Sequence, residues 1–266
     1  MVGADVADGK AMREVAMKLR QEFCPEVGIK KRKSEERKPE PQRELLPQAP
    51  ETKPRVIVNA PLDFELKKLD QNHPYLDGRG FTKETVAHFG LGYCSKGLLA
   101  GRIAIPVHTK DGKLVGYCGR IVDDSKINEE NPRYKFPPPR EREGVTYEFH
   151  KLDLLYNANR IQKPVENLIV VEGFPSVWWI HQMGIPESVA FMGWVMSDEQ
   201  AGIITDLVTP KGTVWLMPDG DEAGRKCTEQ SLPRLALHRR VRLIKPDEGK
   251  QPTDYCGAYF REWLAK

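Results

Sequence analysis

Short apolar runs alternate with helix-like segments over the C-terminal part of the chain, and this alternation limits the possible fold more than any other feature. Such alternation is typical of a parallel sheet with helices on both faces. Strand-like runs occupy residues 168–171, 188–192, 213–217 and 240–244, and helical patterns occupy residues 175–183, 197–207, 222–237 and 253–264. We therefore predict an α/β domain over residues 165–266.

The N-terminal part of the chain has a different composition. Residues 10–23 place apolar side chains at three- and four-residue spacings, which indicates a helix. Residues 30–55 are charged and rich in proline, and such a composition cannot offset the entropy lost on ordering. We expect a helical segment within residues 1–29 and a disordered linker over residues 30–60.

A smaller mixed α+β subdomain is expected over residues 61–164. Residues 82–90 begin with threonine and end with glycine, which predicts a helix capped at both ends. An Asp-Gly pair separates two apolar runs at residues 102–108 and 114–120. This dipeptide favours a tight turn, so the two runs are predicted to form a β-hairpin.

Charge and cysteine usage argue against several classes of protein. The net charge is only +3, so any nucleic-acid binding has to come from local basic patches. No apolar run is long enough to span a membrane, and the first residues lack the pattern of a secretory signal. The five cysteines form no Cys-x-x-Cys pair, which argues against a structural zinc site. We expect a cytoplasmic protein that binds neither zinc nor a membrane.

Three carboxylates follow strands of the predicted sheet. Glu172 closes the first strand, and Asp219 and Asp221 flank a glycine after the third. Ligands of parallel α/β sheets bind beyond the carboxyl ends of the strands, and carboxylate oxygens suit hard cations that keep several waters. Acidic residues at these positions can also act only as helix caps, but capping alone explains the whole set poorly. We predict a Mg²⁺ or Mn²⁺ site at Glu172, Asp219 and Asp221.

These positions resemble the signature of the Toprim fold, which DnaG-type primases, topoisomerases and some nucleases share. The matching residues are Glu172, Gly173, Asp219, Asp221 and Gly224. Upstream, residues 101–107, 116–123 and 132–134 resemble the N-terminal part of the DnaG-type polymerase core. The likeness covers about residues 61–264 and implies a Toprim domain preceded by a smaller subdomain.

Two stretches depart from the resemblance or extend it. Residues 8–23 resemble the last helix of the zinc ribbon in plasmid- and element-borne primases, without the cysteines and histidine of that ribbon. The core of the family usually carries Asp-Pro-Asp after a glycine, whereas residues 249–254 contain a single acid, Asp254. Asp254 is therefore only an additional candidate metal ligand.

The resemblance implies synthesis of RNA primers on single-stranded DNA from ribonucleoside triphosphates. Glu172, Asp219 and Asp221 would be the catalytic residues and would hold Mg²⁺ or Mn²⁺. Tyr134 would either stack on a base or pack against its neighbours. A groove for template and triphosphate is expected to contain Arg102, Arg120, Arg133, Tyr134 and Lys135.

Other partners and functions also follow from the resemblance. A replicative helicase and a separate zinc-ribbon chain are the further candidate partners. A truncated primase could bind nucleic acid or a replication partner without catalysis, and a Toprim nuclease could hydrolyse phosphodiesters at the same metal site. A topoisomerase would need a tyrosine nucleophile on a separate winged-helix domain, which does not fit in 266 residues.

Four of the five tryptophans divide into two groups. Trp178, Trp179 and Trp215 lie within predicted helices or strands beside apolar residues, so we expect them in the core. Trp194 follows a glycine at a strand end near the carboxylates. Its role stays open between packing and base stacking.

Overall fold

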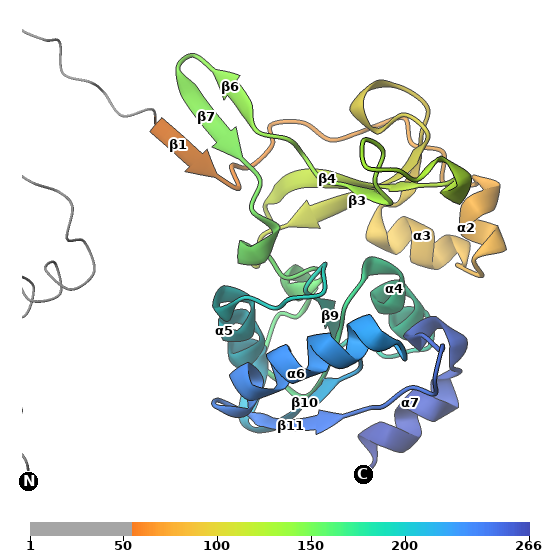
Figure 1. Cartoon of the computed structure of the whole chain (residues 1–266), viewed down its shortest axis with the longest axis vertical. Coiled ribbons are helices and arrows are strands. Elements are labelled where there is room, and N and C mark those ends of the chain that lie inside the picture. The colour runs from red at the N-terminus through yellow and green to blue at the C-terminus, as the bar shows by residue number, and fades with distance from the viewer. Residues whose placement is uncertain (1–54) are drawn as a thin grey trace, which may run out of the picture. The chain divides into compact units, whose positions relative to one another are not determined.

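The computed structural model describes residues 55–266 (Figure 1). The helix predicted at residues 10–23 and most of the linker predicted at residues 30–60 lie outside the described residues. Strand β1 (Arg55–Val58), however, lies inside that linker range and pairs in parallel with β7 (Val145–Glu148). The predicted end of the linker at residue 60 is therefore too late. So short a strand is stabilised by a distant partner that local composition does not reveal.

An antiparallel sheet forms the centre of the N-terminal subdomain, which we define as residues 55–164. The hairpin predicted there is confirmed, since β3 (Arg102–His108) pairs with β4 (Leu114–Ile121) and Gly112 in the turn has φ 81°. The capped helix is confirmed as α3 (Lys83–Phe89), where the Thr82 side chain accepts from Thr85 N and Gly90 has φ 64°. The sheet order is β2 (Gly92–Cys94), β3 (Arg102–His108), β4 (Leu114–Ile121) and β5 (Tyr134–Lys135). The remaining main elements are α2 (Pro74–Gly78), α3 (Lys83–Phe89) and β6 (Arg140–Arg142), which pairs with β7.

The C-terminal part is the predicted parallel sheet with helices. Its strand order is β11-β10-β8-β9, and every neighbouring pair is parallel. The capping box that begins α5 joins Ser197 and Gln200. In chain order the elements are β8 (Val165–Val171), α4 (Phe174–Gln182), β9 (Ser188–Ala190), α5 (Asp198–Leu207), β10 (Val208–Leu216), α6 (Glu222–Ala236), β11 (Arg240–Leu243) and α7 (Gly257–Leu264).

Alternate residues of β8 pack on opposite faces of this sheet. Ile169 and Val171 belong to a cluster that also contains Phe174 and Phe260 of α4 and α7. Residues 168 and 170 belong to a second cluster with side chains of α5 and α6. Because successive side chains of a strand point to opposite faces, α4 and α7 cover one face and α5 and α6 cover the other.

The first of these clusters continues into the N-terminal subdomain. It contains Ile103 and Ile105 of β3 together with Leu76 and Phe89, all at most 1% exposed. The described residues 55–266 accordingly lie in one compact unit. This shared core joins the N-terminal subdomain to the face of the parallel sheet that α4 covers, and Figure 1 shows the subdomain above that part of the chain.

Of the three tryptophans predicted to lie in the core, two are fully buried and one is partly buried. Trp178 and Trp215 are each 2% exposed. Trp179 is partly buried against the first cluster, and its indole N–H donates to the carbonyl of Tyr255 at 2.7 Å. Within residues 55–266, no helix is long and apolar enough to cross a membrane.

Candidate active site

Strands β8 and β10 bring Glu172 and Asp219 together. The two strands are neighbours in parallel register, and Met217 N donates to Val170 O at 2.9 Å just beyond the paired residues. Both strands then leave the sheet at the same edge. There Asp219 N donates to Glu172 Oε1 at 3.0 Å. The backbone of one acidic residue thus positions the carboxylate of the other.

Two glycines shape the turn that carries the aspartates. Gly220 N donates to Lys250 O at 2.8 Å, and Gly249 N donates to Gly220 O at 2.7 Å. A Cβ atom on Gly220 would overlap the carbonyl oxygen of Asp247, and one on Gly224 would overlap the carbonyl oxygen of Asp219. The Asp-Gly-Asp-x-x-Gly pattern therefore reflects close backbone contacts that leave no space for a side chain.

Asp221 acts as a helix cap in this structure. Its Oδ1 accepts from Gly224 N at 2.8 Å and begins α6. Asp254 accepts from Gln251 N through Oδ2 at 2.7 Å. Over residues 55–266, no three His, Cys, Asp or Glu side chains are grouped so as to hold one ion together. The structure thus pairs Glu172 with Asp219 and places the other two aspartates around that pair.

The electrostatics of the pair fit a site for a divalent cation. Burial raises the pKa of Glu172 to about 7, and the charges of Asp219 and Asp221 add to this effect. Burial also raises the pKa of Asp219 to about 6, with contributions from Asp221 and Asp254. Both shifts mean that negative charge is unfavourable here without a positive partner. Carboxylate oxygens are hard donors of the kind that Mg²⁺ and Mn²⁺ prefer, and a bound ion would relieve this repulsion.

A cavity of about 270 Å³ adjoins the pair, and we call it the carboxylate cavity. Arg79, at the end of α2, belongs to its lining and was not predicted from the sequence, because nothing in the local pattern distinguishes it from other surface arginines. The lining combines both halves of the described chain: Arg79, Arg120, Asp124, Arg133, Tyr134, Phe136, Glu172, Gly173, Phe174, Pro175, Ser176, Met192, Gly193, Asp219 and Gln251.

Comparison with known proteins identifies this fold. Residues 169–256, which include all four acids, match the family model described as Toprim-like. A DNA primase of Deinococcus radiodurans is 31% identical over 219 residues, which cover 68% of this chain and 36% of the relative. A DNA primase of Geobacillus stearothermophilus is 29% identical over 229 residues, covering 72% and 36%.

Solved structures extend the likeness beyond the Toprim-like segment. A DnaG primase catalytic domain bound to single-stranded DNA has a TM-score of 0.59 at 22% identity, covering 73% of this chain and 71% of that chain. The zinc-binding and RNA polymerase domains of Aquifex aeolicus primase give 0.59 at 21% identity, covering 72% and 53%. This chain has the fold of a DnaG primase catalytic core. It spans about a third of the length of the curated primases that it matches.

Arg120 of this primase-like core is held in place on the cavity wall. Its guanidinium donates to Asp124 Oδ1 at 2.7 Å and to Oδ2 at 3.2 Å. It also lies 5.6 Å from the ring centroids of both Tyr75 and Tyr134. Tyr134 in turn packs 5.6 Å from the ring of Phe174, so of the two predicted roles for Tyr134 its surroundings show packing. Arg133 is exposed beside it.

Arg102 and Lys135 do not belong to the lining of the carboxylate cavity. Arg102 is 3% exposed, and its guanidinium donates to the carbonyl oxygens of Gly119 at 3.0 Å and Pro132 at 2.8 Å. Arg102 is therefore buried and does not make the predicted groove contact. Its hydrogen bonds hold the segment before Arg133. Lys135 lies in β5 next to Tyr134, and side chains of adjacent strand residues point to opposite faces.

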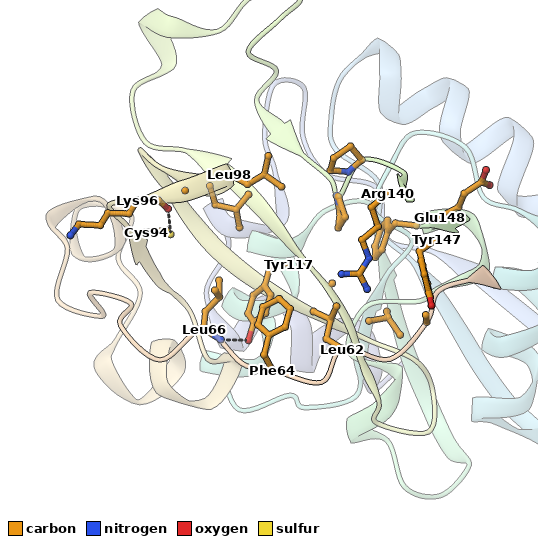
Figure 2. Close-up of a pocket in the computed structure, with 18 residues that line it drawn as sticks. Leu62, Phe64, Leu66, Cys94, Lys96, Leu98, Tyr117, Arg140, Tyr147 and Glu148 are labelled. Carbon is orange, nitrogen blue, oxygen red and sulfur yellow. Dashed lines mark hydrogen bonds between the residues drawn. The ribbon is translucent and has the colours of Figure 1, made fainter. Parts of the chain in front are cut away.

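A second cavity lies away from the carboxylates. It measures about 380 Å³ and contains no predicted site residue (Figure 2). Mostly apolar side chains of the N-terminal subdomain surround it, among them Leu62, Phe64, Leu98 and Tyr117. Because it offers few charged groups, it suits apolar contact and not phosphate chemistry. The carboxylate cavity is therefore the candidate active site.

Proposed function

We propose that this chain synthesises RNA primers on single-stranded DNA with Mg²⁺ or Mn²⁺ at Glu172 and Asp219. One observation carries the proposal: a single cavity joins these two carboxylates to Arg120 and Arg133 of the N-terminal subdomain. Metal-binding acids and phosphate-binding arginines then face the same space. In this proposal residues 165–266 act as the catalytic Toprim domain, and residues 61–164 supply the basic wall.

The arrangement suits phosphoryl transfer, which needs positioning and charge neutralisation more than covalent help. A bound divalent cation would neutralise triphosphate oxygens and orient the reacting groups. Glu172 and Asp219 would hold it as ionised carboxylates, and their raised pKa values would fall as it binds. Arg120, already fixed by Asp124, would contact phosphate oxygens without losing further side-chain freedom.

Asp221 and Asp254 are proposed as supporting acids. Both charges contribute to the raised pKa of Asp219, so both would add to the negative potential that a cation meets at this pair. Asp221 would approach a bound ion only by weakening its cap on α6. We therefore expect Asp219 to be more important for metal affinity than Asp221.

The proposed partners are single-stranded DNA and ribonucleoside triphosphates. Support comes from the names of the relatives, which are DNA primases, and from the neighbouring catalytic domain that is bound to single-stranded DNA. A separate zinc-ribbon chain and a replicative helicase are proposed as further partners, and the cytoplasm as the location.

A second candidate is a module that binds nucleic acid without catalysis. The observation in its favour is that Asp221, one of the three predicted metal ligands, is already used as a helix cap. Both candidates predict nucleic-acid binding, but only the first predicts nucleotide incorporation that depends on Glu172 and Asp219.

Primer synthesis on single-stranded DNA with ribonucleotides and Mn²⁺ tests the proposal. We expect little initiation by the chain alone, more initiation when a zinc-ribbon chain is added, and measurable extension of a preformed primer. Initiation suffers more because two nucleotides and a template must be held without an anchored primer. Asp219→Asn and Glu172→Gln should abolish extension, whereas Glu229→Gln, at an exposed position of α6, should not.

The outcomes separate the candidate functions. Extension that is absent from the wild type and both variants, with nucleic-acid binding retained, would favour the non-catalytic module. Metal-dependent cutting of the DNA without nucleotide incorporation would favour the nuclease. Isothermal titration with Mn²⁺ checks the metal site separately, since Asp219→Asn combined with Asp221→Asn should abolish the binding heat.

A further inference from the structure

Trp194 exposes a large apolar surface beside the carboxylate cavity. It is 61% exposed, whereas Trp178 and Trp215 are each 2% exposed. The residues directly before it, Met192 and Gly193, belong to the lining of the cavity that contains Glu172 and Asp219. Trp194 itself does not line the cavity, but it directly follows two residues that do, which places it next to the rim of the candidate active site.

The segment that carries Trp194 is anchored on both sides. Met192 is 5% exposed and Met196 is 0% exposed, so buried side chains flank the exposed indole. Gln200, at 0% exposure, donates through Nε2 to the carbonyl oxygen of Phe191 at 2.9 Å. Ser197 Oγ donates to the carbonyl oxygen of Leu152 at 2.6 Å. The backbone on both sides of Trp194 is thus tied to the core.

The backbone turns sharply at Met192. Its φ of 61° lies in the left-handed region, which is unfavourable for a residue other than glycine. Lys151 Nζ approaches the Met192 carbonyl oxygen at 3.5 Å. Unfavourable backbone conformations of this kind persist where the surroundings enforce them, and they concentrate at functional sites. Here the turn carries the chain from the cavity wall to the exposed indole.

Exposure alone does not indicate a site, because single exposed apolar residues are common on protein surfaces. Leu237 is 80% exposed at the end of α6 and lines none of the cavities described above. Trp194 differs in three respects: its neighbours line a charged cavity, its segment is anchored by buried side chains, and its indole is large and flat.

We propose that Trp194 stacks on a nucleobase whose phosphates lie in the carboxylate cavity. This proposal deepens the proposed function and rests on it. The cavity supplies Arg79, Arg120 and Arg133 for phosphate oxygens, and the rim supplies an aromatic face for the base. Stacking on an aromatic side chain tolerates every base, because each base has a flat π-surface. The base belongs either to a free ribonucleoside triphosphate or to a single-stranded polynucleotide.

Equilibrium binding by the full chain tests this proposal without catalysis. The variants are Trp194→Ala, Trp194→Phe and, as a control, Leu237→Ala. The probes are a short oligothymidylate, an abasic oligomer of equal length, ATP and inorganic triphosphate. Comparing each base-containing probe with its base-free partner separates stacking from phosphate contact, and comparing the oligomer with ATP identifies the source of the base.

Trp194→Ala should weaken binding of one base-containing probe by about 5- to 100-fold and leave the base-free probes unchanged. Trp194→Phe should restore most of the affinity, since it keeps an aromatic face, and Leu237→Ala should behave as the wild type. Binding should also quench the tryptophan fluorescence of the wild type more than that of Trp194→Phe.

Three results would overturn the proposal: equal affinity of Trp194→Ala and wild type for both base-containing probes, equal losses for the base-free probes, or no binding of any probe by the wild type. Failure of the proposed function is seen separately, as primer extension that is absent from the wild type or that Asp219→Asn leaves intact. Because the binding measurements need no turnover, the two failures are distinguished.

Discussion

Glu172→Gln should stabilise the metal-free protein at alkaline pH, although it removes a proposed catalytic group. Burial and the neighbouring aspartates raise the pKa of Glu172 from its ordinary value of 4.5 to about 7. The ionised carboxylate is therefore less favourable in the folded chain than in the unfolded chain. Glutamine has nearly the same shape without the charge, and its amide oxygen can still accept from Asp219 N, as Glu172 Oε1 does.

The direction of this pH dependence follows from the linkage between protonation and folding. Below the pKa that Glu172 has in the unfolded chain, its carboxyl is protonated in both the folded and the unfolded state. Its burial then does not reduce the stability of the fold electrostatically. As the pH rises from about 4.5 through about 7, the wild type loses stability because the folded state binds the proton more tightly. Each tenfold difference in the dissociation constant corresponds to about 1.4 kcal/mol, so the whole effect has a ceiling of about 3 kcal/mol.

We expect about half of that ceiling, because Glu172 is only partly buried and water and local relaxation reduce the repulsion. The free energy of unfolding of Glu172→Gln should exceed that of the wild type by about 1–2 kcal/mol more at pH 8 than at pH 5. Urea denaturation with a chelator present measures this difference. Added Mn²⁺ should reduce the gap at pH 8, since it stabilises only a chain that binds it.

The control is Glu229→Gln, an exposed position of α6, which should show no such pH dependence. A Glu172→Gln protein that is less stable than the wild type at pH 8, or equally stabilised at both pH values, would refute the electrostatic account of this site.

Three further predictions follow from the packing. In urea titration, Gly224→Ala should lower the free energy of unfolding by about 1–3 kcal/mol, and it should weaken Mn²⁺ binding, because its Cβ would displace the Asp219 backbone. The control Gly202→Ala lies in α5 with open space around the new Cβ, so it should be neutral or stabilising. Arg102→Ala should lower the free energy of unfolding by about 1–3 kcal/mol, because it removes the donor to the buried carbonyl oxygen of Gly119 and to the partly buried one of Pro132. Arg133→Ala should leave thermal melting nearly unchanged and weaken binding of triphosphate. A chain beginning at residue 52 should resist proteolysis at the β6–β7 hairpin better than one beginning at residue 61, because only the longer chain keeps β1 paired with β7. Equal rates of cleavage of the two chains would contradict this prediction.

Local pattern was sufficient for the architecture of the C-terminal sheet. Apolar runs and caps report which faces of each segment are buried, and alternating strands and helices leave few ways to bury those faces together. The adjacency of Glu172 and Asp219 followed as well, since neighbouring parallel strands end at one edge of a sheet. The two glycines of the turn were visible as residues, but their close backbone contacts were not.

Tertiary structure alone decided what depends on distant partners. The pairing of β1 with β7 joins segments far apart in the chain, and no local pattern encodes that choice. Arg102 and Arg120 both lie near strand ends and both are buried, at 3% and 4% exposure, yet Arg102 donates to backbone carbonyl oxygens away from the cavity whereas Arg120, paired with Asp124, lines it. The difference arises because a long side chain takes its direction from the segments that fold around it. For the same reason the sequence determined which acids lie at the site, while the folded chain determined that Asp221 caps a helix, that Arg79 lines the cavity and that Trp194 is exposed.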